Sequence, residues 1–320
     1  MEDYMKFTEE LRARVVAEMG EGYETGIQQV AKANIGVTDA LNVFRKDGKG
    51  KAGPAFYLPP LFGEYRKGRG VEDIAGDIAA AYHAQAADME GLAGSLGDIT
   101  SYGSIKDRIY FRLLCTERNR AFLKNVLHFE VLDLSMVVYI LIRADESGIG
   151  SVPVQNRLLE SWGVPAEEVR GQAGKNTPLL FPPRVLHLAS AMADILRDAG
   201  TGGAAGMEAA AENMPEGAGP YIMTNTKGIN GFSTVLYPGA LEGFTGFGRK
   251  NLYVLPSSVH EALLLPADAS MAPQELQEMA REVNGTVVEE TDILSDTVYY
   301  YDRQKNGLSI AGEEEKCVRL

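Results

Sequence analysis

Hydrophobic residues recur with two different spacings along the chain, and each spacing predicts a different element. Between residues 71 and 82, apolar side chains follow one another at steps of three or four, which is the spacing of one helical face. Residues 23–33 and 37–45 instead show partial alternation and are separated by Asn-Ile-Gly, which predicts two strands joined by a turn. The chain is therefore expected to contain both helices and strands.

Residues 129–142 hold a dense apolar, β-branched stretch, which predicts a central strand buried on both faces. Asp133 interrupts this stretch, and a buried carboxylate must be hydrogen-bonded or paired. Asp133 is therefore a candidate for a perturbed, catalytic carboxylate. The nine apolar residues 134–142 are too few to span a bilayer, which needs about 20 residues in a helix, so we expect no membrane segment.

The Gly/Ala/Glu-rich residues 200–220 are typical of a linker or mobile loop, with a short helical insert as the alternative. Together these patterns predict an α+β fold with mixed β-sheets flanked by helices. We expect two lobes, residues 1–199 and 221–320, although strands of both could share one sheet. The downstream pattern predicts a helix over 184–199, a hairpin of strands 221–225 and 232–237, strands over 259–265 and 297–301, and a frayed charged tail.

Composition narrows the class of protein. The 320 residues are 45% hydrophobic and 23% charged, which is typical of a globular protein with a substantial core. The net charge of −13 disfavours direct binding to nucleic acid, whose phosphates an acidic surface repels. Two cysteines without a CxxC motif, and an N-terminus without an apolar signal segment, predict a cytoplasmic protein.

The segment LPSSVHEALLLP, residues 255–266, contains the most suggestive dipeptide, His260-Glu261. A zincin needs a second histidine four residues later, but that position is Leu264. On the predicted strand, His260 and Glu261 would point to opposite faces and could not hold one ion. A structural or hydrogen-bonding role is the first interpretation, and a catalytic role for both residues is the alternative.

Other common chemistries lack their motifs. Ser257 and Ser258 are not within GxSxG, and no phosphate-binding GxxxxGK[ST] occurs. The four histidines are far apart in sequence, without the spacing of a metal site. We therefore predict neither a cofactor nor a metal ion.

Asp296 and Asp302 flank three consecutive tyrosines. Alternation places Tyr299 and Tyr301 on one face of a strand and Tyr300 on the other. These tyrosines are either amphipathic strand residues or an aromatic recognition surface. Two further binding candidates, Asn176 and Asn225, lie at predicted element ends, where asparagine usually caps or turns the chain.

Six phrases occur in a specific order along the chain: PAFYLPPLFGEYRKG, HFEVLDLSMVVYI, QAGKNTPLLFP, YIMTNTKGINGFSTVLY, LYVLPSSVHEALLLP and EVNGTVVEETDILSDTVYYYD. Together they resemble an uncharacterised bacterial family known as a domain of unknown function. The order of strand, Pro-Ser-Ser turn and strand is also distantly similar to a second uncharacterised bacterial group. This resemblance implies one α+β architecture over nearly the whole chain, and it brings no activity, substrate, cofactor or site residue.

Three functional hypotheses remain open. The first is a cytosolic, non-enzymatic binding or regulatory protein that contacts a protein partner through the tyrosine strand or the hairpin. The second is a hydrolase-like enzyme of unrecognised type, in which His260, Glu261, Asp133 and Asp296 converge in a cleft. The third is an acidic inhibitor, from a mobile element, of an enzyme that acts on nucleic acid.

Overall fold

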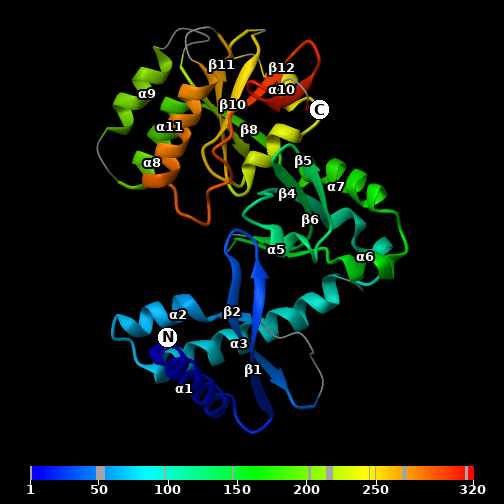
Figure 1. Ribbon diagram of the computed structural model, residues 1–320, viewed down its shortest axis with the longest axis vertical. Coiled ribbons are helices and arrows are strands. Elements are labelled where there is room, and N and C mark those ends of the chain that lie inside the picture. The colour runs from blue at the N-terminus through cyan, green and yellow to red at the C-terminus, as the bar shows by residue number, and fades with distance from the viewer. Residues whose placement is uncertain are drawn as a thin grey trace. The chain divides into compact units, whose positions relative to one another are not determined.

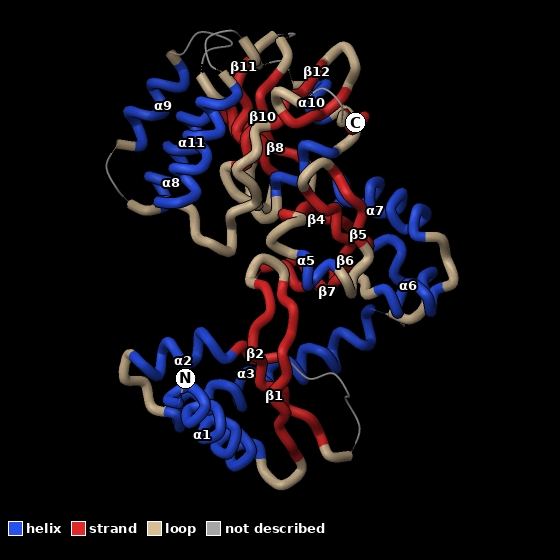
Figure 2. Tube along the Cα trace, in the orientation of Figure 1, coloured by secondary structure: helices blue, strands red, loops and turns tan. Residues whose placement is uncertain are grey.

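The computed structural model describes residues 2–47, 55–96, 99–145, 148–200, 203–213, 219–244, 246–248, 250–268, 272–313 and 316–320. The chain divides into two compact units, residues 1–99 and 100–320. Helices and antiparallel sheets occur in both units (Figures 1 and 2), which confirms the predicted α+β class. No helix within the described ranges is long and apolar enough to cross a bilayer.

The first unit packs helices against a three-stranded antiparallel sheet. Its elements are α1 (Glu2–Met19), β1 (Tyr23–Lys32), β2 (Gly36–Arg45), β3 (Ala55–Tyr57), α2 (Leu58–Arg66) and α3 (Val71–Leu96), with the strand order β1-β2-β3. The predicted hairpin is confirmed, because β1 and β2 pair along ten residues each. Asn34 (φ 62°) and Gly36 (φ 86°) in the turn adopt the left-handed conformation, which these residue types tolerate.

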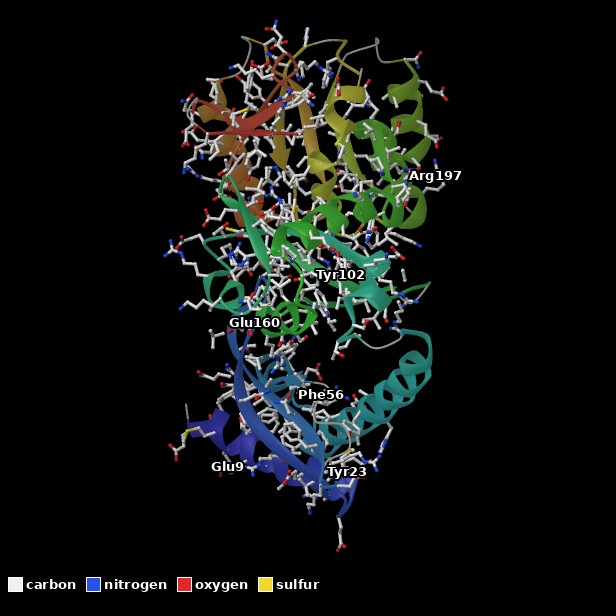
Figure 3. All side chains as sticks on the ribbon, turned by 90° about the vertical axis from the view of Figure 1, so that its right-hand side faces the viewer. Glu9, Tyr23, Phe56, Tyr102, Glu160 and Arg197 are labelled. Atoms are coloured by element: carbon white, nitrogen blue, oxygen red, sulfur yellow. The ribbon has the colours of Figure 1, made fainter. Side chains whose placement is uncertain are left out.

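A regular apolar stripe builds the core of this unit. Phe7, Leu11, Val15 and Met19 recur every fourth residue of α1, and all four are buried. They belong to one cluster with apolar side chains of α3 and of β2, as expected for an amphipathic helix that covers a sheet. Tyr23 and Phe56, labelled in Figure 3, pack partly buried against the same cluster.

The second unit contains the remaining elements. They are α4 (Tyr102–Ile105), η1 (Lys106–Arg108), β4 (Ile109–Cys115), α5 (Arg120–Leu123), β5 (His128–Val131), β6 (Leu134–Asp145), β7 (Gly148–Pro153), α6 (Asn156–Trp162), α7 (Ala166–Leu180), β8 (Pro183–His187), α8 (Leu188–Asp198), α9 (Ala204–Glu212), β9 (Tyr221–Asn225), η2 (Gly231–Leu236), α10 (Ala240–Gly243), β10 (Leu252–Pro256), β11 (Ala262–Pro266), α11 (Pro273–Thr286), β12 (Tyr299–Asp302), β13 (Gly307–Ile310) and β14 (Cys317–Arg319).

Two sheets organise this unit. One has seven strands in the order β14-β13-β12-β10-β11-β9-β8, and the other joins β4, β6 and β5, with β7 also paired to β6. The two sheets pack against each other through one buried apolar cluster. It contains Val254 and Tyr299 of the seven-stranded sheet and Phe111 and Val138 of the other sheet. The other face of the seven-stranded sheet packs through Leu255 against α11, and Figure 1 shows α8, α9 and α11 on that side.

Hydroxyl and amide side chains protect the free edge of β4. The Phe111 N–H donates to Thr177 Oγ1 at 3.1 Å, and the Leu113 N–H donates to Ser233 Oγ at 3.2 Å. Asn176 Nδ2 donates to the Ile109 carbonyl at 2.8 Å. Buried backbone groups need such partners, so α7 and η2 substitute for a neighbouring strand and connect the two sheets.

Several predicted elements differ from the structure. The single strand expected over 129–142 is two strands, β5 and β6, joined by a two-residue turn at Leu132-Asp133. The helix expected over 184–199 starts only at Leu188, because Pro183–His187 pair with β9 as a strand. The strand expected over 232–237 is the 3₁₀ helix η2, whose Ser233 and Thr234 are buried.

The C-terminal part contains more strands than the sequence predicted. The tyrosine strand β12 is followed by β13 and β14, whereas the sequence analysis expected a frayed tail. These strands are only four and three residues long, so they are too short to give a clear alternating pattern. Hydrogen-bonded pairing to β12 and β13, rather than local sequence preference, defines them.

The segment 200–220 lies within the second unit. β8 precedes it, β9 follows it, and these two strands pair with each other. The helical insert proposed as an alternative is present as α9, whereas residues 201–202 and 214–218 lie outside the described ranges. The compact units divide at residue 99, whereas the sequence pattern placed a boundary at 200–220, and strands from both sides of that segment belong to one sheet.

Because the Tyr139 phenol in β6 is buried, we expect the protein to lose stability at alkaline pH. Burial raises the pKa of this phenol from 10 to about 12, although Arg112, whose guanidinium carbon lies 4.4 Å from the ring centroid, acts in the opposite direction. The folded state therefore holds this proton more tightly than the unfolded chain. Its contribution is complete below pH 10 and is lost as the pH rises to about 12.

We expect the free energy of unfolding to fall by about 2–3 kcal/mol through Tyr139 over this pH range. Urea denaturation of the full chain at several pH values would measure the fall. Tyr139→Phe is the matched control, and it should show a shallower pH dependence than the wild type. Equal slopes for the two proteins would show that Tyr139 does not contribute.

Candidate functional site

A groove with a volume of about 410 Å³ lies on the seven-stranded sheet, beside the start of α11 at Pro273. Its walls come from β10, β12, β13 and β14 and from the turns next to them. Ligand pockets usually have volumes of about 300–1,000 Å³. The groove is therefore large enough for a small molecule or for one side chain of a partner.

Four side chains form the floor of this groove in a single row across the sheet. Tyr253 pairs with Tyr300, Tyr300 with Ser309, and Ser309 with Cys317. Directly paired residues of neighbouring strands lie on the same face of a sheet. All four residues line the groove, which therefore has two phenol rings, a hydroxyl and a thiol along its floor.

The two tyrosines form a half-buried aromatic platform. Their ring centroids are 6.0 Å apart and the rings are tilted by 59°, within the range of attractive aromatic pairs. Asn251 Nδ2 donates a hydrogen bond of 2.6 Å to the Tyr300 hydroxyl and holds this ring in place. Burial is the main cause that raises the pKa of Tyr253, and the nearby Tyr300 and Asp268 raise it further, so the Tyr253 phenol is neutral at physiological pH.

Asp302, Lys305 and Glu313 supply the charges of the groove. Asp302 Oδ1 accepts the backbone N–H groups of Gln304 (2.9 Å) and Lys305 (3.2 Å), which fixes the carboxylate at the start of the β12–β13 turn. Its Oδ2 lies 3.6 Å from Lys305 Nζ. The Asp302 side chain is 21% exposed and that of Lys305 is 76% exposed, so a fixed carboxylate faces a solvated amine.

Arg303 anchors the same turn to the rest of the unit. Its guanidinium donates to the carbonyl oxygens of Lys250 (2.7 Å), Glu242 (3.0 Å) and Phe244. Hydrogen bonds to charged groups are stronger than neutral ones. The end of the groove that carries Asp302 is therefore held in position before any ligand arrives.

Asp133 occupies the turn between β5 and β6 rather than a buried strand. Its Oδ2 accepts hydrogen bonds from Ser295 Oγ (2.7 Å) and Thr297 Oγ1 (2.9 Å), and its Oδ1 accepts one from the Tyr299 hydroxyl (2.7 Å). The expected need for hydrogen bonds is confirmed. Three hydroxyl donors occupy the carboxylate, which joins the four-stranded sheet to the segment that leads into β12.

His260 and Glu261 precede β11 and lie in the β10–β11 connection, so the expected strand placement of both residues is wrong. His260 Nδ1 accepts the Asn230 N–H (3.1 Å), and its Nε2 lies 3.6 Å from Asp292 Oδ1. Glu261 Oε1 instead accepts a hydrogen bond from Ser257 Oγ (3.2 Å). The two neighbours thus contact different groups, and both imidazole nitrogens have partners.

Asp296 has its own contact and does not share a partner with Asp133. Its Oδ1 accepts a 2.7 Å hydrogen bond from Asn284 Nδ2, which also approaches the Ser295 carbonyl at 3.3 Å. Asn284 is buried on α11, so this contact attaches the helix to residues 295–296. Within the described residues, no three His, Cys, Asp or Glu side chains gather as a metal site.

The alternation predicted for the tyrosine strand, β12, is confirmed. The two tyrosines proposed as a recognition surface, Tyr299 and Tyr301, nevertheless lie on its buried face. Tyr299 and Tyr301 are 1% and 0% exposed, and the Tyr301 hydroxyl donates to Asn306 Oδ1 at 2.8 Å. Neither ring can therefore form an exposed recognition surface. The neighbouring Tyr300 lines the groove.

The two asparagine candidates are occupied by contacts within the fold. Asn176 Nδ2 donates to the carbonyls of Lys106 (2.7 Å) and Ile109 (2.8 Å), and its Oδ1 accepts from Gln172. Asn225 accepts the Lys227 N–H at 2.9 Å and donates to the Ile229 carbonyl at 2.8 Å. The usual role of asparagine in turns explains Asn225. Asn176 instead lies inside α7 rather than at an element end, and its amide attaches this helix to η1 and β4.

Asn225 also lines a second, much smaller cavity, of about 10 Å³, together with Ser233 and Tyr237. Within the described part of the chain, the Tyr237 hydroxyl is buried without a hydrogen-bond partner, and burial raises its pKa. A cavity of this size holds about one water molecule. It is too small for an organic ligand. Two other hollows, of about 330 and 360 Å³, lie beside α8 and α9 and beside β8 and β9, and the groove of about 410 Å³ is larger than either.

A protein-family model described as a family of unknown function, DUF5688, matches residues 4–303. The chain belongs to this family. No curated protein and no solved structure matches the chain. Membership of DUF5688 confirms the resemblance inferred from the sequence, and the matched range covers both compact units up to the turn after β12.

Only some of the residues that line the groove could be predicted from the amino-acid sequence of this DUF5688 protein. Tyr300 was placed on the correct face but not selected, and Tyr253, Ser309 and Cys317 were missed. The row that unites them depends on pairing between separate strands, including that of Tyr253 with Tyr300, which is 47 residues away in the sequence. Alternation within one strand identifies a face, but it does not show which strands are neighbours.

Proposed function

We propose that this protein is a non-enzymatic, cytoplasmic binding or regulatory protein that binds its ligand in the groove of the tyrosine strand. The groove itself is the observation that supports this proposal. It combines an aromatic floor with fixed polar groups, which is the usual composition of a ligand site. Free Cys115 and Cys317 are typical of a reducing compartment and support the cytoplasmic location.

The enzyme hypothesis receives less support from the same contacts. A general base must reach its substrate proton at hydrogen-bond distance. The catalytic candidates His260, Glu261, Asp133 and Asp296 instead form hydrogen bonds with different residues of the fold. The inhibitor hypothesis would need carboxylates gathered on one face, and the groove contains both Asp302 and Lys305.

Three probes of nearly equal size and different charge test the proposal: benzamide, benzoate and benzamidinium. Saturation-transfer NMR would measure the binding of each probe to the full chain and to the Tyr300→Ala variant. We expect at least one probe to bind the wild type and to lose about tenfold in affinity in the variant, because a ring of the floor contributes about 1–1.5 kcal/mol.

Leu179→Ala is the matched control, because Leu179 lies on α7, is 79% exposed and does not line the groove. It should leave the binding of every probe unchanged. Circular dichroism of both variants would verify that they fold. If none of the three probes binds, or if Tyr300→Ala and Leu179→Ala weaken binding equally, the groove is not the binding site.

A further inference from the structure

We propose that the groove selects an organic cation, namely a guanidinium or ammonium group on an apolar stem. This inference rests on the proposed binding function and adds the chemical class of the ligand. Three independent features of the groove support it: the aromatic floor, the balance of charges around it, and the contact that an amine of the chain already makes there.

The aromatic floor suits a cation. The face of a phenol ring carries negative electrostatic potential and attracts a cation within about 6 Å of its centroid. Tyr253 and Tyr300 both line the groove. The same chain uses this attraction elsewhere, because Lys32 Nζ lies 3.7 Å from the Tyr57 ring centroid. An apolar stem on the ligand would add contact with the rings.

The charges of the groove are also favourable. The three charged residues that line it are Asp302, Glu313 and Lys305, which gives two negative charges and one positive charge. Within the described residues, Glu313 forms no ion pair. The whole chain carries −13, and such a field attracts cations toward a negative groove over long range.

Lys305 shows where a ligand cation would bind. Its Nζ lies 3.6 Å from Asp302 Oδ2, so the carboxylate is already positioned to pair with an amine. Because this lysine side chain is 76% exposed, its ion pair is weak and solvated, and a ligand cation can replace it. Lys305 is therefore a competitor of a cationic ligand, whereas it would be the main contact of an anionic one.

Removal of the Lys305 charge should strengthen the binding of a cationic ligand and weaken the binding of an anionic one. Isothermal titration of the full chain with benzamidinium and benzoate would be compared for the wild type, Asp302→Asn and Lys305→Met. We expect benzamidinium to bind at least about tenfold more tightly than benzoate. Its affinity should fall about fivefold in Asp302→Asn and rise about threefold in Lys305→Met, as solvent-exposed pairs of about 1 kcal/mol imply.

Asparagine can keep the turn contacts that Asp302 makes with Gln304 and Lys305, so Asp302→Asn should fold. Acetyl-Gly-Arg-Gly-amide and agmatine then distinguish the two sources of such a cation. Tighter binding of the peptide indicates a basic protein segment, and tighter binding of agmatine indicates a free amine.

Each result separates this inference from the proposed function. Benzamide or benzoate binding in a Tyr300-dependent way, with benzamidinium no tighter, overturns cation selection and leaves the binding function standing. Weaker benzamidinium binding in Lys305→Met also overturns cation selection. Absence of binding by all three probes removes the binding function and this inference together.

Discussion

Gly231→Ala is expected to destabilise the protein by about 3–5 kcal/mol, because the new methyl group would collide with backbone. A Cβ at this position would overlap Thr224 Oγ1 and the His260 carbonyl oxygen, and it would lie 2.9 Å from the backbone nitrogen of Asn225. Two of these three atoms belong to the main chain. Rotation of a side chain therefore cannot relieve the collision, and β9 or the β10–β11 connection must shift.

The neighbouring contacts make such a shift costly. Thr224 Oγ1 donates to the His260 carbonyl at 2.8 Å, and the Phe232 N–H donates to the Val259 carbonyl at 3.3 Å. The Asn230 N–H donates to His260 Nδ1. A displacement of residues 230–232 would break several of these hydrogen bonds together, and buried polar groups without partners cost about 1–3 kcal/mol each.

Urea denaturation followed by circular dichroism would measure the effect, with Gly171→Ala as the matched control. Gly171 lies inside α7, and a Cβ there would meet no atom within 4 Å. This variant should be stabilised by about 0.5–1 kcal/mol, because alanine is the better helix former. If both variants had the same stability as the wild type, the close approach at Gly231 would not exist in solution.

Elements that follow from a local sequence pattern were predicted correctly, whereas elements that depend on tertiary contacts were missed. The β1–β2 hairpin was predicted almost to the residue, since alternation on both sides of Asn-Ile-Gly is a purely local signal. The β5–β6 turn was missed because Leu132-Asp133 contains no glycine or asparagine. Leu132 nevertheless adopts φ 58°, a conformation that local preference disfavours for leucine and that the surrounding contacts maintain.

The tyrosine strand shows the limit of alternation in another way. The separation of Tyr300 from Tyr299 and Tyr301 followed from the two-residue period. The buried side could not be predicted, because residues on both faces are tyrosines and therefore give no contrast in polarity. Packing of the seven-stranded sheet against the four-stranded sheet decides it, and this packing depends on residues more than 150 positions apart, such as Phe111 and Tyr299.

The candidate catalytic residues were selected from the sequence by residue type, whereas the contacts that each one makes depend on its neighbours in the fold. His260, Asp133 and Asp296 were selected as polar residues in apolar surroundings. Their partners are Asn230 and Asp292, three hydroxyl groups, and Asn284, respectively. The contacts of Asp133 and Asp296 help to define how β12 and α11 are attached, and a catalytic role for the three candidates stays a hypothesis.

Asp133→Ala is expected to lower the free energy of unfolding by about 3–5 kcal/mol. The carboxylate accepts hydrogen bonds from Ser295, Thr297 and Tyr299, and bonds to a charged acceptor contribute about 1.5–3 kcal/mol each. Because Tyr299 is 1% exposed, its hydroxyl would remain buried without a partner. The exposure of Ser295 is also low, at 8%, so water cannot fully replace the lost acceptor.

Denaturation of three further variants by urea would separate the individual contributions. Tyr299→Phe removes one donor and should cost about 1–2 kcal/mol. Asp133→Asn keeps an acceptor oxygen without the charge and should lie between Asp133→Ala and the wild type. Glu167→Ala, in which an exposed carboxylate beside Arg170 is lost, should change stability by less than about 0.5 kcal/mol. An Asp133→Ala variant as stable as Glu167→Ala would mean that the carboxylate does not hold β12 to the β5–β6 turn.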